Sequence, residues 1–228
     1  MKKILTSISI FFIAMVLFTS FAKAQQVPFS GTIIYDVKAA GEIPEQAKSM
    51  IPNEMTFKIA EDKQSMFMQA GMMEQKTIYD AVKQEADMMM DVMGQKLIVK
   101  NTAFLINNMK KKDGITTSVK FTNEKKTLAG YSCKKAIVTM KSKEGTETTM
   151  DVYYTEDIDV SRYKFSSSFP EINGLPMEFT LKFGPMLFNM VARSIKKESI
   201  PASEFLIASD YQEVTTEGLL NMFGMGGQ

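Results

Sequence analysis

Methionine offers the most distinctive chemistry in this chain of 228 residues, which contains 20 methionines and no tryptophan. Many of them lie between residues 66 and 93, where Met66-x-Met68 and Met88-x-Met90 form two pairs. Residues two apart in a β-strand point to the same face of the sheet, so each pair would present two thioethers together. Thioether sulfur is a soft ligand that selects soft ions such as copper(I). These four methionines are therefore a candidate copper(I) site.

The methionines have two other interpretations, and the sequence leaves both open. An unbranched thioether side chain fills irregular gaps, so the excess can simply build a core. Alternatively, a curved sheet lined with such flexible side chains can repack around lipid tails of different shape. The spacing of apolar residues does not distinguish a filled interior from a hollow one.

The chain lacks most of the side chains that common catalytic and metal sites use. It has no histidine and a single cysteine, which excludes Ser-His-Asp and Cys-His catalytic groups, His-ligated zinc or haem, and disulfides within the chain. Cys133 follows Tyr131-Ser132 in a strand-like stretch and is predicted to be a small buried apolar residue. No glycine-rich phosphate loop and no G-x-S-x-G motif occurs. We therefore expect no enzymatic activity and no cofactor.

Five aspartates are candidates for acid, base or metal chemistry, but their spacing completes no motif. Asp157 and Asp159 form an Asp-x-Asp pair without the glycine and later glutamate of a calcium loop, which favours a solvated turn. Asp80, Asp87 and Asp91 could supply a pair of catalytic carboxylates, but the sequence does not fix their separation. Surface charge is the commoner role for such residues.

The first 24 residues have the pattern of a cleavable export signal. Lys2 and Lys3 precede an apolar stretch over residues 4–21, and Ala22-Lys23-Ala24 places small residues at the two positions that a signal peptidase reads. Cleavage before Gln25 would leave residues 25–228 as one β-rich domain that is periplasmic or secreted. An uncleaved anchor is the alternative. No cysteine follows the cleavage point, so no lipid attachment is expected.

The charge balance of the mature chain is close to neutral. Loss of the three leader lysines from 27 basic residues leaves 24, against 26 acidic residues, which is a net charge of −2. Such a protein offers little to nucleic acid. No second stretch of 18 apolar residues occurs, so no transmembrane span is expected after cleavage of the signal.

Alternation of apolar and polar residues predicts the strands. Residues 55–59 and 177–183 alternate strictly, and residues 32–37, 96–99, 135–139 and 150–154 are rich in β-branched or alternating apolar side chains. Glycines at 114, 130, 145 and 174 mark turns between these stretches. We expect a mainly β chain with an antiparallel sheet of nine to eleven strands, as a sandwich, a barrel or a strongly curved sheet. Short helices are expected at Pro44–Met50 and Glu217–Phe223.

Four stretches in succession carry a family resemblance: residues 31–35, 126–136, 152–158 and 173–179. This succession resembles the bacterial envelope family called domain of unknown function 4412, and Gly174-Leu175-Pro176 is similar to an element of the related GLPGLI family. These families resemble the periplasmic lipoprotein carriers, in which an unclosed antiparallel β-barrel wraps short helices and shelters acyl chains. The resemblance implies a curved sheet or unclosed half-barrel, and it brings no catalytic residue.

The first hypothesis for function is a non-enzymatic periplasmic or secreted protein that binds a lipid or other apolar ligand on the concave face of the curved sheet. The predicted lining consists of alternating apolar residues: Met55, Phe57, Met66, Met68, Met88, Met90, Met177 and Phe179. The alternative is a structural or interaction module of the cell envelope, with a filled core and an envelope protein as partner. The third hypothesis is copper(I) binding by Met66, Met68, Met88 and Met90.

Overall fold

The structure is a computed structural model that describes residues 28–41, 48, 51–102, 114–183 and 186–222. The expected signal peptide, residues 1–24, lies outside these ranges. So does the helix expected over residues 44–50, apart from Lys48. The helix expected at the C-terminal end is confirmed as α3 (Thr216–Met222), shifted by one residue.

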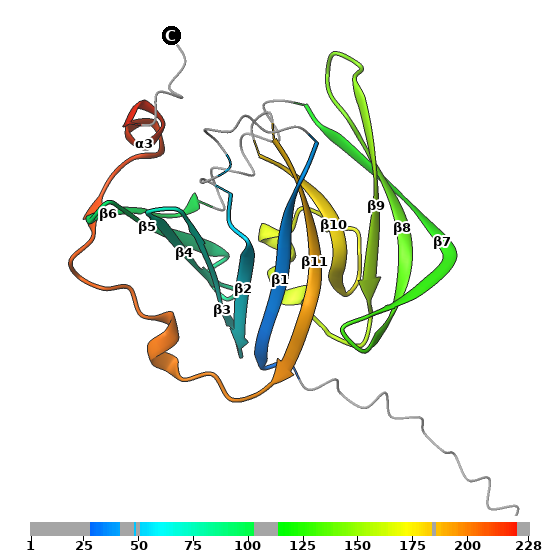
Figure 1. Cartoon of the computed structure of the whole chain (residues 1–228), viewed down its shortest axis with the longest axis horizontal. Coiled ribbons are helices and arrows are strands. Elements are labelled where there is room, and N and C mark those ends of the chain that lie inside the picture. Colours follow the sequence, from blue (N-terminus) through cyan, green and yellow to red (C-terminus); the bar gives the residue numbers. More distant parts are fainter. Residues whose placement is uncertain (1–27, 42–47, 49–50, 103–113, 184–185, 223–228) are drawn as a thin grey trace, which may run out of the picture.

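The described residues form one sheet of twelve strands, which is curved and does not close into a barrel (Figure 1). In chain order the strands are β1 (Gly31–Ala40), β2 (Glu54–Ala60), β3 (Lys63–Ala70), β4 (Met73–Asp80), β5 (Glu85–Val92), β6 (Gln95–Val99), β7 (Thr116–Leu128), β8 (Tyr131–Lys141), β9 (Glu147–Thr155), β10 (Leu175–Phe183), β11 (Met186–Lys197) and β12 (Gln212–Glu213). Their order across the sheet is β12-β6-β5-β4-β3-β2-β1-β11-β10-β9-β8-β7. The predicted mainly β, curved and unclosed fold is thus confirmed, with one strand more than the predicted upper number.

The topology joins two meanders of consecutive strands. Strands β2 to β6 continue from β1 as antiparallel neighbours, β7 to β11 form the second series, and β1 pairs with β11 to unite them. The two-residue β12 is the exception, because it runs parallel to β6. Each tight antiparallel connection needs a turn whose twist matches the strands. Ala129 and Gly130, with φ of 47° and 83°, supply such a turn between β7 and β8.

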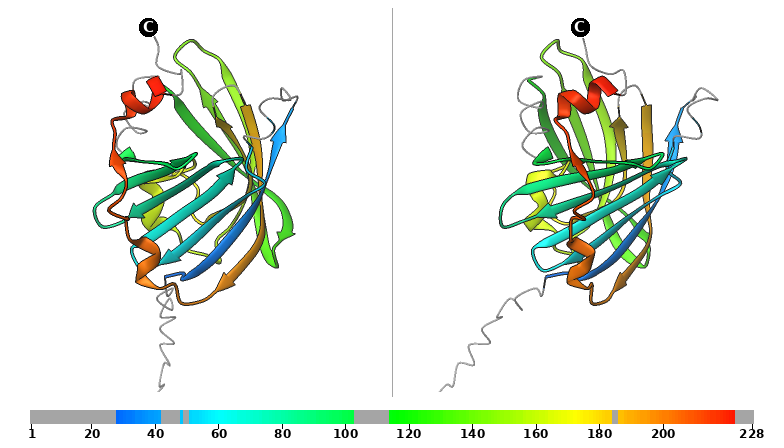
Figure 2. Two further views of the ribbon diagram at one scale, coloured as in Figure 1. Left: turned by 60° about the vertical axis from the view of Figure 1, so that its left-hand side comes forward. Right: turned by 90° about the vertical axis from the view of Figure 1, so that its left-hand side faces the viewer.

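The strand register fixes which side chains share the concave face. Directly opposed residues of paired strands lie on the same face, and one row across the first meander consists of Ile33, Phe57, Met66, Thr77, Met88 and Val99. The neighbouring row consists of Tyr35, Met55, Met68, Gln75, Met90 and Leu97. The segment that follows β9, with the short helix η1 (Ser161–Ser166), lies inside the bend of the sheet (Figure 2).

One end of the concave face is filled by apolar packing, and we call it the packed end. Phe29, Ile158 and Tyr163 pack with Ile33 and Tyr35 in one buried cluster. Next to it, side chains after η1 cover the second meander in a separate cluster that contains Phe169, Ile172, Ala136, Val138, Val152 and Tyr154. Together these clusters hold the two halves of the bent sheet at a fixed curvature.

Four aromatic rings connect the two meanders across the floor of the concave face. The Tyr35 ring meets Phe57 edge to face at a centroid distance of 5.5 Å and Phe179 at 5.7 Å. Phe179 in turn meets Phe169 at 5.5 Å. Tyr35 lies opposite Ala192 of β11, and this small side chain leaves space for the ring to reach β10. Such edge-to-face pairs stabilise by about 0.5–1.5 kcal/mol each beyond their buried area.

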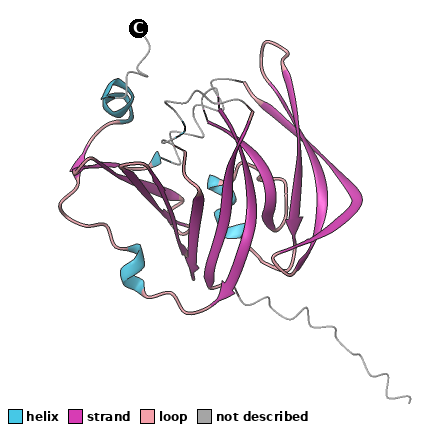
Figure 3. Ribbon diagram, viewed as in Figure 1, coloured by secondary structure: helices cyan, strands magenta, loops and turns pink. Residues whose placement is uncertain are grey.

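The C-terminal segment, residues 198–222, crosses the first meander, and we call it the strap. Its first part covers the convex face, whereas α3 at its end packs on concave residues of β5 and β6. The strap runs outside the sheet through the short helix η2 (Ala202–Phe205) and then along β6 to α3 (Figures 1 and 3). Phe205 and Tyr211 pack on a cluster of Ile78, Met89 and Ile98. The strap therefore gives the outer face of the first meander its own small core.

A charged contact attaches the strap to the sheet. The Glu204 carboxylate accepts hydrogen bonds from Lys58 Nζ at 2.7 Å and from Ser65 Oγ at 3.1 Å, and Lys76 Nζ lies 2.9 Å away. Burial raises the pKa of Glu204, but the hydrogen bonds from the two lysines outweigh it, so the pKa lies below its ordinary value of 4.5. The ionised carboxylate is therefore the form that the folded strap favours.

Replacing Glu204 with glutamine is expected to lower the free energy of unfolding by about 1–2 kcal/mol, because both ammonium groups lose their charged partner. The lowered pKa also sets a pH dependence. Stability from Glu204 is present above its unfolded pKa and is lost as the pH falls through the lowered folded value, so the difference between wild type and Glu204→Gln should shrink as the pH falls below 4.5. Urea unfolding of both proteins at several pH values measures this difference. A difference that stays constant with pH would contradict the role of this carboxylate.

Candidate functional site

Apolar side chains are left half-buried on the concave face between the packed end and α3. Met55 and Phe57 pack against the cluster of the packed end, and Met73 and Met88 pack against the cluster under α3. The half-buried side chains come from the neighbouring strands β2, β3, β4 and β5, and their positions follow the alternation of each strand. We call this set the methionine face, and it consists of Met55, Phe57, Met66, Met68, Met73 and Met88. Phe179, Leu181 and Phe188 are half-buried on the same side of β10 and β11. The site is therefore a surface of thioethers and rings rather than an array of polar groups.

The register brings the predicted residues of the first meander together. Met68 lies opposite Met55, and Met66 lies opposite Phe57, so these four form one compact block on β2 and β3. Met88 lies on the same face, across β4 from Met66. The expectation that each Met-x-Met pair shares one strand face agrees with this register.

The same geometry separates the two methionine pairs. Gln75 and Thr77 of β4 stand between them, because Thr77 is opposite both Met66 and Met88, and Gln75 is opposite both Met68 and Met90. Two strand spacings put the backbones of β3 and β5 about 10 Å apart. A single copper(I) ion with four sulfur ligands would need all four side chains to lean over β4. In the described part of the chain, no group of three His, Cys, Asp or Glu residues forms a metal cluster.

The remaining predicted lining residues have different environments. Met90 is 7% exposed and packs under Leu219 of α3, together with Leu97 and Val99. Met177 is fully buried in the cluster at the packed end. Phe179 is half-buried within the aromatic row. Met90 is thus covered by the strap and Met177 belongs to the core, whereas Phe179 extends the apolar surface toward β10.

Sequence reasoning missed a polar stripe on β3 and β4 that runs through the methionine face. Gln75 and Thr77 are linked by a side-chain hydrogen bond of 3.4 Å, and Gln64 and Tyr79 lie opposite one another on β3 and β4. Thr77 is 4% exposed and Gln64 is 8% exposed. Burial raises the pKa of Tyr79 to about 12, so its hydroxyl stays protonated. The stripe gives an otherwise apolar surface a few hydrogen-bonding atoms.

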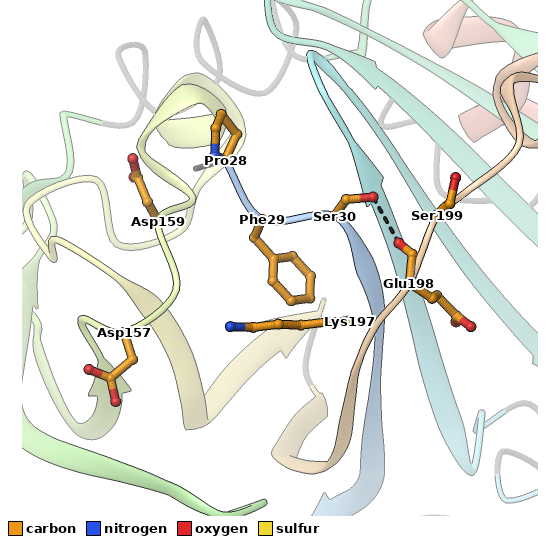
Figure 4. Close-up of a pocket in the computed structure, with 8 residues that line it drawn as sticks. All are labelled: Pro28, Phe29, Ser30, Asp157, Asp159, Lys197, Glu198 and Ser199. Atoms are coloured by element: carbon orange, nitrogen blue, oxygen red, sulfur yellow. Dashed lines mark hydrogen bonds between the residues drawn. The ribbon is translucent and has the colours of Figure 1, made fainter. Parts of the chain in front are cut away.

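A separate pocket of about 460 Å³ lies at the packed end, near the start of β1 (Figure 4). Its lining is mixed in charge and consists of Pro28, Phe29, Ser30, Asp157, Asp159, Lys197, Glu198 and Ser199. The Ser30 hydroxyl donates to the Glu198 carbonyl at 2.9 Å. None of the predicted lining residues contributes to this pocket, and its charged rim does not suit an acyl chain.

Comparison with known proteins adds no assignment to this geometry: no protein-family model and no curated protein matches the sequence. Across the described ranges, no helix is both long enough and apolar enough to cross a membrane.

The aspartates do not assemble into a catalytic pair. Asp80 ion-pairs with Lys63 and accepts two backbone hydrogen bonds in the turn after β4. Asp91 lies at the opposite end of the β4–β5 hairpin, where it accepts the Gly94 N–H at 2.8 Å. Asp87 accepts the Asn101 N–H at 3.0 Å. Each carboxylate serves a turn or strand end, consistent with the interpretation as surface charge.

The Asp-x-Asp pair and the cysteine also have local roles. Asp157 and Asp159 are exposed in the turn before η1, and Asp159 accepts the Ser161 N–H at 2.9 Å, which holds its pKa below the ordinary value. Cys133 is fully buried, and its Sγ lies 3.4 Å from the Tyr131 carbonyl oxygen. Burial raises the pKa of this thiol. The predictions of a solvated turn and a buried small residue are confirmed.

Proposed function

We propose that this protein is a non-enzymatic protein of the bacterial envelope that binds a lipid or another acyl chain on the methionine face. One observation carries the proposal. On a single concave face, two regions are covered by the chain itself, while the methionine block between them stays half-buried. A half-buried apolar surface of this kind gains free energy when a ligand removes it from water.

The composition of the face suits ligands of variable shape. Complete burial of one such side chain is worth about 1.5–3 kcal/mol before the costs of ordering the ligand are subtracted. Methionine has three rotatable side-chain bonds and repacks easily, so one surface can follow chains of different length or unsaturation. The proposal therefore implies broad specificity among acyl chains.

The polar stripe supports an amphipathic ligand. Gln75 and Thr77 stand in the middle of the methionine face, and their side chains can donate or accept hydrogen bonds there. An acyl ester or fatty acid carries oxygens at one end of its chain, and those oxygens would pair with this stripe. A pure hydrocarbon would add no hydrogen-bond partner to the existing contact between Gln75 and Thr77.

The place of action belongs to the same proposal. The export pattern in residues 1–24 and the resemblance to domain of unknown function 4412 both suggest an exported bacterial protein. The likeness to periplasmic lipoprotein carriers suggests a carrier. The curved, unclosed sheet with a segment inside its bend supports this suggestion.

Native mass spectrometry of the protein purified from its bacterial cells tests the proposal. The expected result is a mass increment that gentle activation releases as a fatty acid or phospholipid. Delipidated protein should then take up added palmitoleic acid with one-to-one stoichiometry. Protein that carries no lipid and also ignores the added fatty acid would contradict the proposal.

A second candidate function rests on the edge strand β7, which lies at the other end of the strand order from β12. Strand β7 has thirteen residues and, within the described ranges, pairs with β8 on one side only; Phe121 on it is 55% exposed. An extended segment of an envelope protein could add to this edge as a further strand. A partner complex that survives purification and is lost in a Phe121→Ser variant, in protein that holds no lipid, would favour this interaction module.

A further inference from the structure

Methionine is the oxidant-reactive side chain that this fold leaves accessible. The chain has no tryptophan and no histidine, and its one cysteine is Cys133. Cys133 is fully buried, and burial raises its pKa, so the reactive thiolate is suppressed. Two-electron oxidants that reach this protein therefore meet thioethers before any other soft side chain.

The exposure of these thioethers decreases from one rim of the methionine face, formed by the turns with Met72 and Met93, toward the face itself. Met72 and Met93 are 72% and 75% exposed, in the turns after β3 and after β5. The Met93 N–H donates to the Met72 carbonyl at 3.3 Å, so the two turns lie side by side at this rim. The half-buried methionines of the face come next. Fully shielded methionines are found on other parts of the sheet: Met89, Met177 and Met190.

We propose that the rim and the methionine face are a modification site at which oxygen-atom donors such as hypochlorous acid form methionine sulfoxide, and that this modification releases the bound acyl chain. In the step, the thioether sulfur attacks the oxidant oxygen and a sulfur–oxygen bond forms. The oxygen–chlorine bond breaks, and chloride and a proton leave. Sulfur is oxidised by two electrons and chlorine is reduced by two.

The consequence for binding follows from the polarity of the product. A sulfoxide is polar and chiral, so it no longer matches an acyl chain. Met66, Met68 and Met88 would contact the ligand, and their oxidation weakens binding. Met72 and Met93 lie in the turns, so their oxidation alone leaves binding unchanged. The release step rests on the proposed acyl-chain function, whereas the order of oxidation does not.

Peptide mapping tests the order of oxidation. The full chain is treated with increasing sub-stoichiometric amounts of hypochlorous acid, and the added oxygen is located on each methionine by mass spectrometry. Among the methionines whose exposure the structure describes, Met72 and Met93 should react first and the methionine face second, while Met89, Met177 and Met190 stay unmodified in folded protein. Equal oxidation of exposed and buried methionines would overturn the proposal.

Binding of N-phenyl-1-naphthylamine before and after oxidation tests the release. Wild-type protein in which the methionines of the face have been oxidised should bind this probe about tenfold more weakly than the reduced protein. Methionine sulfoxide reductases should restore the affinity. A matched variant in which all five methionines of the face (Met55, Met66, Met68, Met73 and Met88) are replaced by leucine approximately conserves volume, and its affinity should change less than about twofold on oxidation. Unchanged affinity in oxidised wild type overturns the release step. Failure of the reduced protein to bind any probe overturns the acyl-chain function instead, and the oxidation order is still measured.

Discussion

Replacing Met68 with lysine is expected to weaken fatty acid binding by about tenfold or more, which corresponds to about 1.4 kcal/mol. Met68 lies in the centre of the methionine face, opposite Met55 and beside the ring of Phe57 on β2. An ammonium group at this position must either give up hydration against the acyl chain or displace the chain from the surface. Fluorescence titration with a labelled fatty acid measures the loss.

The neighbouring residue provides a matched control. Phe67 belongs to the same strand, but it points to the convex face and is 38% exposed. Phe67→Lys introduces the same charge, one residue away, on the opposite side of the sheet. It should leave binding within about twofold of wild type. Equal losses of affinity in Met68→Lys and Phe67→Lys would contradict the role of the methionine face, because they would show that a charge on either side of β3 weakens binding.

Replacing Gly174 with alanine is expected to lower the free energy of unfolding by about 3 kcal/mol or more. Gly174 has a φ of 130°, and an alanine Cβ there would lie 2.1 Å from the Thr155 carbonyl oxygen. The strand pairing of Leu175 with Thr155 begins at this point. The added atom therefore forces β9 and β10 apart where the segment that fills the packed end rejoins the sheet.

Gly130→Ala is the matched control, because it has the strained backbone angle without the close contact between Cβ and a carbonyl oxygen. Gly130 also has a positive φ, 83°, but an added Cβ would meet nothing within 4 Å. Gly130→Ala should lower the free energy of unfolding by about 1 kcal/mol, from the backbone conformation alone. Urea unfolding of the three proteins measures both values. Similar losses at the two glycines would remove the argument that contact with Thr155 fixes the β9–β10 junction.

Period-two alternation predicted the strands well because each of those strands has one face in a core. The stretch 177–183 became the main part of β10, and residues 55–59 became the middle of β2. The glycines also predicted turns correctly, because Gly130 and Gly174 have the positive φ that L side chains avoid.

The sequence did not predict β4, because this strand has polar residues on both faces. Its concave positions include Gln75, Thr77 and Tyr79, and its convex positions include Lys76. Neighbouring strands bury Thr77 and half-bury Gln75 and Tyr79, although none of the three is strongly apolar. Alternation of apolar and polar residues carries no signal in such a strand.

Long-range packing decided the environment of the individual site residues. Met177 and Phe179 alternate in the same strand, yet Met177 is fully buried by the packed end and Phe179 is not. Met90 is covered because the strap brings Leu219 back onto β5 and β6. The spacing of these residues correctly predicted the face that they share, but their burial depended on other segments of the chain, such as the one with Phe29 for Met177 and the one with Leu219 for Met90.

Photo-crosslinking with a diazirine-labelled palmitic acid tests the central claim most directly. The reactive carbon is placed near the end of the chain, and the crosslinked residues are identified by mass spectrometry after delipidation and reloading. The account predicts crosslinks on the methionine face, at Met55, Met66, Met68 and Met88. Crosslinks concentrated instead on convex residues such as Phe67 and Leu206, or no crosslinks in protein that is folded, would contradict it.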